Sequence, residues 1–212
     1  MNYLELINKC LLELNYREVN NFSELVKNDH KRIMTILNVI NREICSSDNW
    51  NFLLRTKTLN IPANTMMVDN TVNGRILHLL IDGEKYKFKG DFEQFLTSNP
   101  TSKTYSVCSD QLLFPKFTEN KTAEIIYYTK NCAISENQTE KEEMTSAEDE
   151  SLLPMPFAEQ LLVYGTCLRQ KGNPSYIKFN YWMSMYKEAL LNLKSKSSID
   201  ANDSAKVRLF RQ

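Results

Sequence analysis

The sequence has few glycines and almost no histidines. It contains five glycines and two histidines among its 212 residues. Neither GxGxxG nor GxxxxGK[ST] occurs, and the phosphate-binding loops that carry these motifs need several closely spaced glycines. His30 and His78 lie in different predicted elements and form no HExxH motif. The sequence therefore argues against nucleotide hydrolysis and against a metal site, and we expect no cofactor.

An excess of one charge and long apolar runs are also missing. Lys and Arg together number 26, as do Asp and Glu, whereas proteins that neutralise DNA phosphates are usually strongly basic. No apolar run approaches the roughly 20 residues that span a bilayer, so no membrane partner is expected. The five cysteines are an odd number without a CxxC pair, and no apolar leader precedes them. This pattern favours reduced thiols in a protein assembled in a cytoplasm.

Apolar residues at helical spacing predict two helices near the start of the chain. The first runs from Tyr3 to Leu14, and a longer one from about Leu25 to Ile44, with Asn21 or Ser23 as its cap. The polar face of the second helix carries Lys27, His30, Lys31 and Arg32. Such a group is more typical of a solvated face than of a site for an anionic partner.

Two further helices are predicted near the other end. One begins near Phe157, because the preceding prolines suit a helix start, and ends at Gly172, with Gly165 allowing a close helix neighbour. The last starts at Pro174 and Ser175, and its predicted a/d seam comprises Tyr176, Phe179, Met183, Tyr186, Leu190 and Leu193. The residues off this seam are Tyr181, Trp182 and Met185. They fit a subunit interface and, equally, a helix buried on two sides within its own subunit.

The middle of the chain has the period of about two that is typical of strands. The predicted strands are Thr56–Ile61, Ile76–Ile81, Lys85–Phe88, Thr104–Val107 and Thr122–Tyr128. Asp82-Gly83 predicts a tight hairpin between two of them, because both residues tolerate positive φ. The following segment, 134–151, is rich in Asp and Glu and reads as a loop too charged to bury.

The predicted fold class is α+β. Helices in 1–50 and 152–194 form a bundle, with a small antiparallel β domain inserted at 51–133 and an acidic loop at 134–151. An extended C-terminal arm occupies 195–212, and its end alternates apolar and basic side chains: Lys206, Val207, Arg208, Leu209, Phe210 and Arg211. The other reading of this segment is a frayed terminus.

No catalytic residue is predicted. The pairs Asp82 with Glu84 and Asp91 with Glu93 contain the acid and base types of a glycosidase. Both pairs border turn signals in surface hairpins, and closeness in sequence does not fix their separation across a substrate. We therefore expect a protein that is not an enzyme.

Several short stretches follow one another in an order that matches a known group of proteins. They are Leu6-Ile7-Asn8, Leu11 to Leu14, Trp50, Tyr86 to Phe92, Tyr105, Asp110 to Pro115, Tyr127-Tyr128, Leu153-Pro154, and the Tyr164-Gly165 helix followed by Phe179. In these stretches and in the order of its elements the chain resembles the head-to-tail connector or adaptor proteins of tailed bacteriophages. These include the tail accessory and head-completion proteins of short-tailed phages and the ring proteins of crAss-like phages. The likeness covers most of the chain and includes no catalytic signature.

The resemblance implies a structural virion protein at the head-tail junction, assembled in the host cytoplasm. Roughly twelve copies would form a ring beneath the portal protein. That ring would lengthen the channel for double-stranded DNA and present a docking surface to a downstream tail or ring protein. In similar adaptors a terminal arm clasps the portal, so residues 206–211 become the expected portal-binding segment.

Two functions of other classes stay open at this stage. A nucleic-acid-binding module would use the second helix and the basic tail to bind backbone phosphates. A peptidoglycan hydrolase would depend on Glu84, Asp91 or Glu93.

Overall fold

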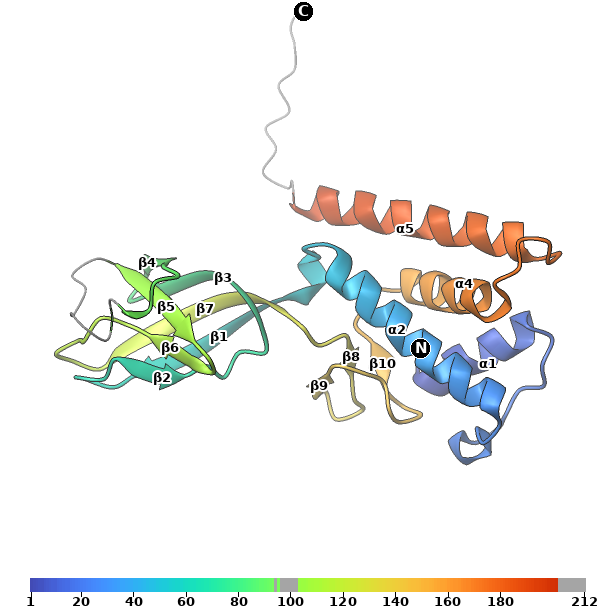
Figure 1. Ribbon diagram of the computed structural model, residues 1–212, viewed down its shortest axis with the longest axis horizontal. Coiled ribbons are helices and arrows are strands. Elements are labelled where there is room, and N and C mark those ends of the chain that lie inside the picture. The colour runs from blue at the N-terminus through green and yellow to red at the C-terminus, as the bar shows by residue number, and fades with distance from the viewer. Residues whose placement is uncertain (94, 96–102, 202–212) are drawn as a thin grey trace, which may run out of the picture. The chain divides into compact units, whose positions relative to one another are not determined.

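The chain folds into two compact units (Figure 1). The computed structural model describes residues 1–93, 95 and 103–201. The helical unit consists of residues 1–53 together with the chain from Asn131 onward, and the β unit consists of residues 54–130. The α+β class, with N- and C-terminal helices and a sheet between them in sequence, is as predicted. Residues 51–53 and 131–133, predicted as part of the inserted domain, belong to the helical unit.

Four α-helices make up most of the described helical unit. They are α1 (Tyr3–Glu13), α2 (Asn28–Ser47), α4 (Phe157–Lys171) and α5 (Phe179–Ala201), with short 3-10 turns η1 (Phe22–Glu24) and η2 (Asn51–Leu53). Helix α4 is central, because it packs against each of the other three. The two ends of the chain therefore close one core.

Local signals place the ends of these helices. Asn2 caps α1 by accepting a hydrogen bond from the Glu5 backbone N–H, and the Glu5 side chain accepts one from the Asn2 N–H. Gly172 ends α4 in the left-handed conformation, with φ of 58°. The predicted limits of α4 are confirmed.

Gly165 lets three helices meet closely, as predicted. A Cβ atom at this position in α4 would lie 3.0 Å from Tyr186 Cε2 of α5 and 3.1 Å from Ile40 Cδ1 of α2. These distances are shorter than ordinary contacts between carbon atoms. An added Cβ would therefore require the Tyr186 ring and the end of the Ile40 side chain to shift by a few tenths of an ångström.

The limits predicted for the second and last helices were wrong. Helix α2 begins at Asn28, and neither Asn21 nor Ser23 caps it, because residues 22–24 form the separate turn η1. Helix α5 begins at Phe179 rather than at Pro174. It continues beyond Lys194 to Ala201, so residues 195–201 of the predicted arm are helical.

The described β unit is a mixed sheet in which the strands follow the order β1-β7-β3-β4-β5-β6-β2. The strands are β1 (Leu54–Ile61), β2 (Met67–Asp69), β3 (Gly74–Ile81), β4 (Glu84–Phe88), β5 (Thr104–Cys108), β6 (Gln111–Leu113) and β7 (Lys121–Thr129). All pairs are antiparallel except β4 with β5. The prediction of a purely antiparallel domain was therefore wrong for this pair.

The five predicted strands are confirmed, and so is the hairpin. Ile81 pairs with Glu84 across the two-residue turn, in which Asp82 and Gly83 have φ of 51° and 79°. Positive φ at both positions defines the turn type that matches strand twist. Strands β2 and β6 were missed because three residues are too few to show an alternating pattern.

Residues from several strands form the core of the β unit. Leu79 of β3 and Ile125 of β7 are buried in one cluster with Leu112 of β6. The side chain of Phe114, fully buried, joins the same cluster. Burial of these apolar surfaces is the main stabilising contribution to the unit.

The acidic segment is folded, contrary to the prediction of a loop. It contains most of a small three-stranded sheet with the order β10-β8-β9, formed by β8 (Ala133–Ile134), β9 (Glu140–Lys141) and β10 (Glu150–Ser151). Met144 and Asp149 are 1% exposed. The segment therefore belongs to the packed body of the helical unit.

Candidate functional site

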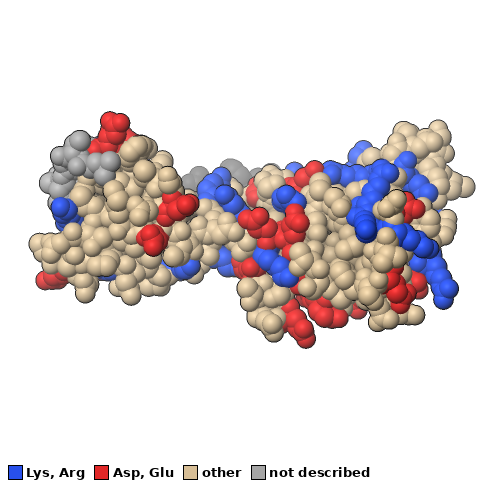
Figure 2. All heavy atoms as spheres, turned by 60° about the horizontal axis from the view of Figure 1, so that its bottom comes forward, with Lys and Arg blue, Asp and Glu red and all other residues tan. Residues whose placement is uncertain are grey.

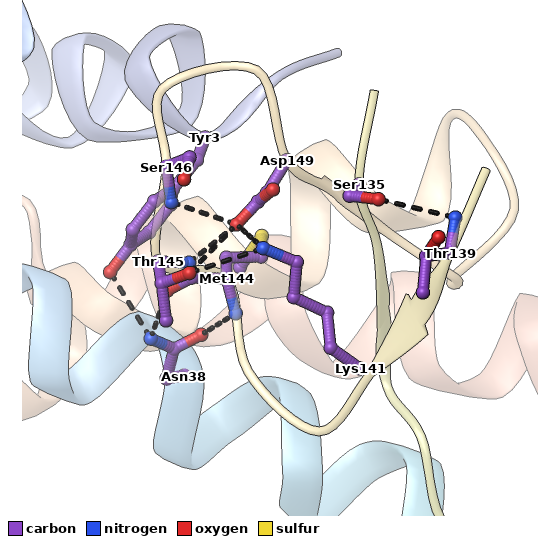
Figure 3. Close-up of polar contacts among 9 residues, drawn as sticks. All are labelled: Tyr3, Asn38, Ser135, Thr139, Lys141, Met144, Thr145, Ser146 and Asp149. Atoms are coloured by element: carbon purple, nitrogen blue, oxygen red, sulfur yellow. Dashed lines mark hydrogen bonds and ion pairs between the residues drawn. The ribbon is translucent and has the colours of Figure 1, made fainter. Parts of the chain in front are cut away.

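A buried carboxylate organises the acidic segment (Figure 3). The Asp149 carboxylate accepts hydrogen bonds from the Lys141 ammonium at 2.8 Å and from the backbone N–H groups of Thr145 at 2.6 Å and Ser146 at 2.8 Å. All three donors come from the chain shortly before Asp149, between residues 141 and 146. Asp149 therefore fixes the turn by satisfying groups that water would otherwise have to solvate.

The surroundings of Asp149 favour its ionised form. Burial acts to raise the pKa of this carboxyl group. The hydrogen bond from Lys141 and those from the N–H groups of Ser146 and Thr145 outweigh burial, so the pKa lies below its usual value. Asp149 is thus a charged structural group at neutral pH.

Two asparagines of α2 fasten the acidic segment to the helices. The Asn38 side chain donates to the Met144 carbonyl at 2.9 Å and accepts from the Met144 N–H at 3.0 Å. One turn further on, Asn41 donates to the Cys132 carbonyl at 2.9 Å and accepts from the Ser151 hydroxyl at 2.7 Å. Each amide satisfies two polar groups, so the segment is held in register along α2.

The residues predicted as a subunit interface do not share one environment. Trp182 is fully buried, stacks on Tyr176 with ring centroids 5.3 Å apart, and donates from Nε1 to Glu13 Oε2 at 2.9 Å. Met185 is half-buried, whereas Tyr181 is 51% exposed. The assignment of Trp182 to an intersubunit surface was therefore wrong, because this side chain is committed to the core of its own subunit.

One side of α5 carries exposed apolar side chains, although the Tyr181 ring also packs edge-on against Tyr164 of α4 with ring centroids 5.7 Å apart. Ile177, just before the helix, is 92% exposed, Tyr181 is 51% exposed and Leu191 is 68% exposed. Ser184 and Glu188 are also exposed and continue the same spacing of three and four residues. We call the surface formed by Ile177, Tyr181, Ser184, Glu188 and Leu191 the outer face of α5.

A hollow of about 390 Å³ lies where α2 begins. Its polar lining includes Arg17, Glu18, Glu24, Lys27, Asp29 and His30. Figure 2 shows lysine and arginine side chains gathered at the right end of the helical unit, the end at which α2 begins in Figure 1. The sequence placed His30 on a solvated face, but it is only 6% exposed. The signal that was missed is its spacing of three from Ile33 and seven from Leu37, which puts His30 in the buried stripe.

The carboxylates considered for a hydrolase lie in the β unit. Glu84 forms an ion pair with Lys103 at 2.7 Å, and Asp82 forms one with Lys121 at 2.8 Å. The hydrogen bond from Lys121 lowers the pKa of Asp82. Asp91 is exposed. In the part of the chain that the structure describes, no group of three or more His, Cys, Asp or Glu side chains could hold a metal ion.

Four of the five cysteines are buried, and none is in a disulfide. The Cys10 thiol lies beside that of Cys167, and burial raises its pKa well above the ordinary value. The Cys45 and Cys132 side chains form a hydrogen bond, and this bond lowers the pKa of the Cys132 thiol.

The predicted portal-binding residues, Lys206 to Arg211, lie outside the described residues. Within residues 1–93, 95 and 103–201, no helix is both long and apolar enough to cross a membrane.

No protein-family model matches this chain, and no curated protein matches it.

Proposed function

We propose that this protein is a subunit of a head-to-tail adaptor ring in a tailed bacteriophage. The ring sits beneath the portal protein, surrounds the channel through which double-stranded DNA passes, and receives a downstream tail or ring protein on its other side. The observation that carries the proposal is the outer face of α5, where Ile177 just before the helix and Tyr181 and Leu191 within it remain exposed. Exposed apolar side chains aligned on one helix are typical of protein interfaces.

The construction of the helical unit supports a role that depends on shape. Trp182 and Lys178 tie the start of α5 to Glu13 of α1, with bonds of 2.9 Å from Trp182 Nε1 to Oε2 and from Lys178 Nζ to the Glu13 carbonyl. Helix α5 is thereby held firmly on the bundle while its outer face stays accessible. A rigid surface suits repeated contacts around a closed ring, in which many modest interfaces add up.

The oligomeric state of Leu191→Asp provides the first test. A buried carboxylate at a contact between copies is unfavourable, so we expect this variant to assemble less than the wild type. Val26→Asp is the matched control, because Val26 is also 68% exposed but lies just before α2. Light scattering after size-exclusion chromatography and electron microscopy, with and without portal protein, measure assembly. A wild-type chain that stays monomeric in the presence of portal would exclude the ring.

The arm is tested by a truncation that leaves the helix intact. Removal of residues 202–212 preserves α5, which ends at Ala201. The apolar side chains of Val207, Leu209 and Phe210 are the expected anchors, so the truncated protein should co-sediment with portal much less than the full chain. A variant in which Lys206, Arg208 and Arg211 alone become Gln separates charge from apolar anchoring. Undiminished portal binding by the truncated protein would exclude the arm as the portal-binding segment.

A further inference from the structure

A hollow of about 560 Å³ lies on the β unit where β3 and β4 separate. Pairing between these two strands runs from their hairpin as far as Leu79 with Tyr86 and stops there. The register of β3 against β7 shifts between Ile76 and His78, and an irregularity of this kind bends a strand. Strand β4 then pairs with β5 instead. The hollow is the space that opens between β3 on one side and β4 and β5 on the other.

The first half of β3 has an open edge toward this hollow. Residues 74–77 line the hollow, and β7 pairs with this part of β3 on the other side. Among the described strands, none pairs with Ile76 or Leu77 on the side of the hollow. Backbone N–H and C=O groups point alternately to the two sides of a strand, so some groups of this stretch face the open edge. An extended peptide satisfies such groups by adding a strand to the sheet.

Exposed apolar side chains border the same space. Phe88 of β4 is 60% exposed and Leu77 of β3 is 42% exposed, and both line the hollow. The buried ring of Tyr105 packs edge-on against Phe88, with ring centroids 5.6 Å apart. The Phe88 ring is therefore supported from one side while more than half of it stays in water. A large apolar side chain of a bound peptide would cover this surface.

The charged side chains that line the hollow are all basic. They are Arg75, Lys85 and Lys87, each of them exposed, and no Asp or Glu belongs to the described lining. An acidic segment complements this charge. Successive side chains of a strand point to opposite faces, so Lys87 and Phe88 lie on opposite faces of β4. A peptide that alternates acidic and apolar residues would match both faces at once.

Other occupants match these features less well. The C-terminal side chains of Lys206, Arg208 and Arg211 would bring positive charge to a basic hollow. Strand β1 of a second copy would do the same through Arg55 and Lys57. A nucleic acid has the complementary charge, but its phosphate backbone lacks the N–H donors that pair with an open strand edge.

We propose that the hollow between β3 and β4 binds an extended acidic segment of another protein, which adds a strand to β3 and places a large apolar side chain against Phe88. The site lies wholly within the β unit and needs neither a ring nor a portal. Failure of the adaptor proposal would therefore leave it standing, and the reverse also holds.

Selection from a library of random peptides of eight residues, the length of β3, supplies a probe for the full chain. We expect the enriched peptides to alternate acidic and large apolar residues. Hydrogen exchange followed by nuclear magnetic resonance then locates the selected peptide. Its binding should slow exchange of the amide of Ile76 or Leu77, because the N–H groups of neighbouring residues point to opposite sides of β3.

Two exposed positions of β4 give variants that should fold normally. Phe88→Ser removes the exposed ring and Lys87→Glu reverses one charge, so each should raise the dissociation constant of the selected peptide about tenfold or more. Met67→Ser and Lys187→Glu are the matched controls, because both residues are exposed and neither lines the hollow. Both controls should bind the peptide as the wild type does.

The proposal is overturned if the selection enriches no sequence or enriches basic peptides. It is equally overturned if Phe88→Ser and Lys87→Glu bind the selected peptide as tightly as the wild type, or if single-stranded DNA binds this hollow more tightly than the peptide. Exchange of the Ile76 or Leu77 amide that slows as the concentration of the protein alone rises would assign the hollow to a second copy, and would also overturn it.

Discussion

At the scale of single residues, the helical unit depends on polar side chains that each satisfy several neighbours. Asp149 accepts from Lys141 and from two backbone N–H groups, and Asn38 and Asn41 each serve two partners. Loss of such a group leaves the partners buried and unsatisfied, which costs more than the hydrogen bond itself contributes. Single substitutions in the acidic segment are consequently expected to lower the stability of the helical unit strongly.

Asp149→Ala should destabilise the helical unit by about 3 kcal/mol, because it leaves Lys141 without its partner and two N–H groups without an acceptor. Urea unfolding followed by far-ultraviolet circular dichroism measures the loss. The control is Glu136→Ala, which removes an exposed acid of the same segment. The control should change stability by no more than about 0.5 kcal/mol.

The same carboxylate gives the helical unit a defined acid sensitivity. Because the folded pKa of Asp149 lies below its unfolded value of about 3.9, its contribution is fully present above that value and is lost as the pH falls through the folded pKa. The wild type should therefore lose stability below about pH 4 more steeply than Asp149→Asn, which cannot titrate at this position. Parallel acid-unfolding curves for the two proteins would contradict this assignment.

At the scale of elements, α5 shows how a periodic pattern can predict a helix and still misplace its buried side. Of the predicted seam, Leu193 is buried, whereas Phe179, Met183 and Leu190 are only half-buried. The other buried positions in the described part of the helix are Trp182 and Ala189. Half-buried Tyr186 lies between them and packs on Gly165. Aromatic and apolar side chains occur around most of α5, so spacing alone fits more than one face. Packing against α4, together with the bond from Trp182 to Glu13, selects the face that is buried.

Trp182→Ala should destabilise the helical unit by about 3–5 kcal/mol, because it empties a large buried volume and leaves the Glu13 carboxylate without the indole donor. Leu12→Ala is the control, since Leu12 is 52% exposed on α1, and it should cost no more than about 0.5 kcal/mol. Urea unfolding of each variant measures the change in the free energy of unfolding. If both variants lost similarly little free energy of unfolding, the Trp182 side chain would lie on a surface of the protein.

At the scale of the whole molecule, the helical unit is assembled from two stretches that are distant in sequence. Residues 1–53 supply α1 and α2, and the chain after Asn131 supplies the small sheet, α4 and α5. The two ends of the β unit lie side by side, because Leu54 at the start of β1 pairs with Tyr128 near the end of β7. An insertion with adjacent ends interrupts its host unit little.

Replacement of residues 54–130 by a short Gly-Ser linker should therefore leave the helical unit folded. The two ends to be joined follow a strand pair whose Cα atoms lie about 5 Å apart, a gap that a few residues span. We expect a strongly helical circular dichroism spectrum and cooperative urea unfolding. A shortened chain that is disordered or unfolds without cooperativity would show that the helical unit needs the β unit.

The class of the fold and most of its elements follow from local patterns in the sequence. Three kinds of signal are local, because each is encoded within a few neighbouring residues. They are the spacing of apolar residues in α1 and α4, the Asp82-Gly83 turn, and the alternation in five strands. Strands β2 and β6 and the start of α5 were not predictable in this way, because short or evenly apolar segments carry no distinct period. The resemblance to phage adaptors likewise came from the order of elements, and it stays a proposal.

Only the tertiary structure decided which polar residues are buried. Asp149 and His30 read as solvated groups in sequence, yet one is enclosed by Lys141 and backbone donors and the other lies in the buried stripe of α2. Burial of a polar group depends on partners supplied by segments distant in sequence or by the folding of a turn, and no local pattern records them. The hollow beside His30 exists for the same reason: α2 and the segment before it meet there only when the chain is folded.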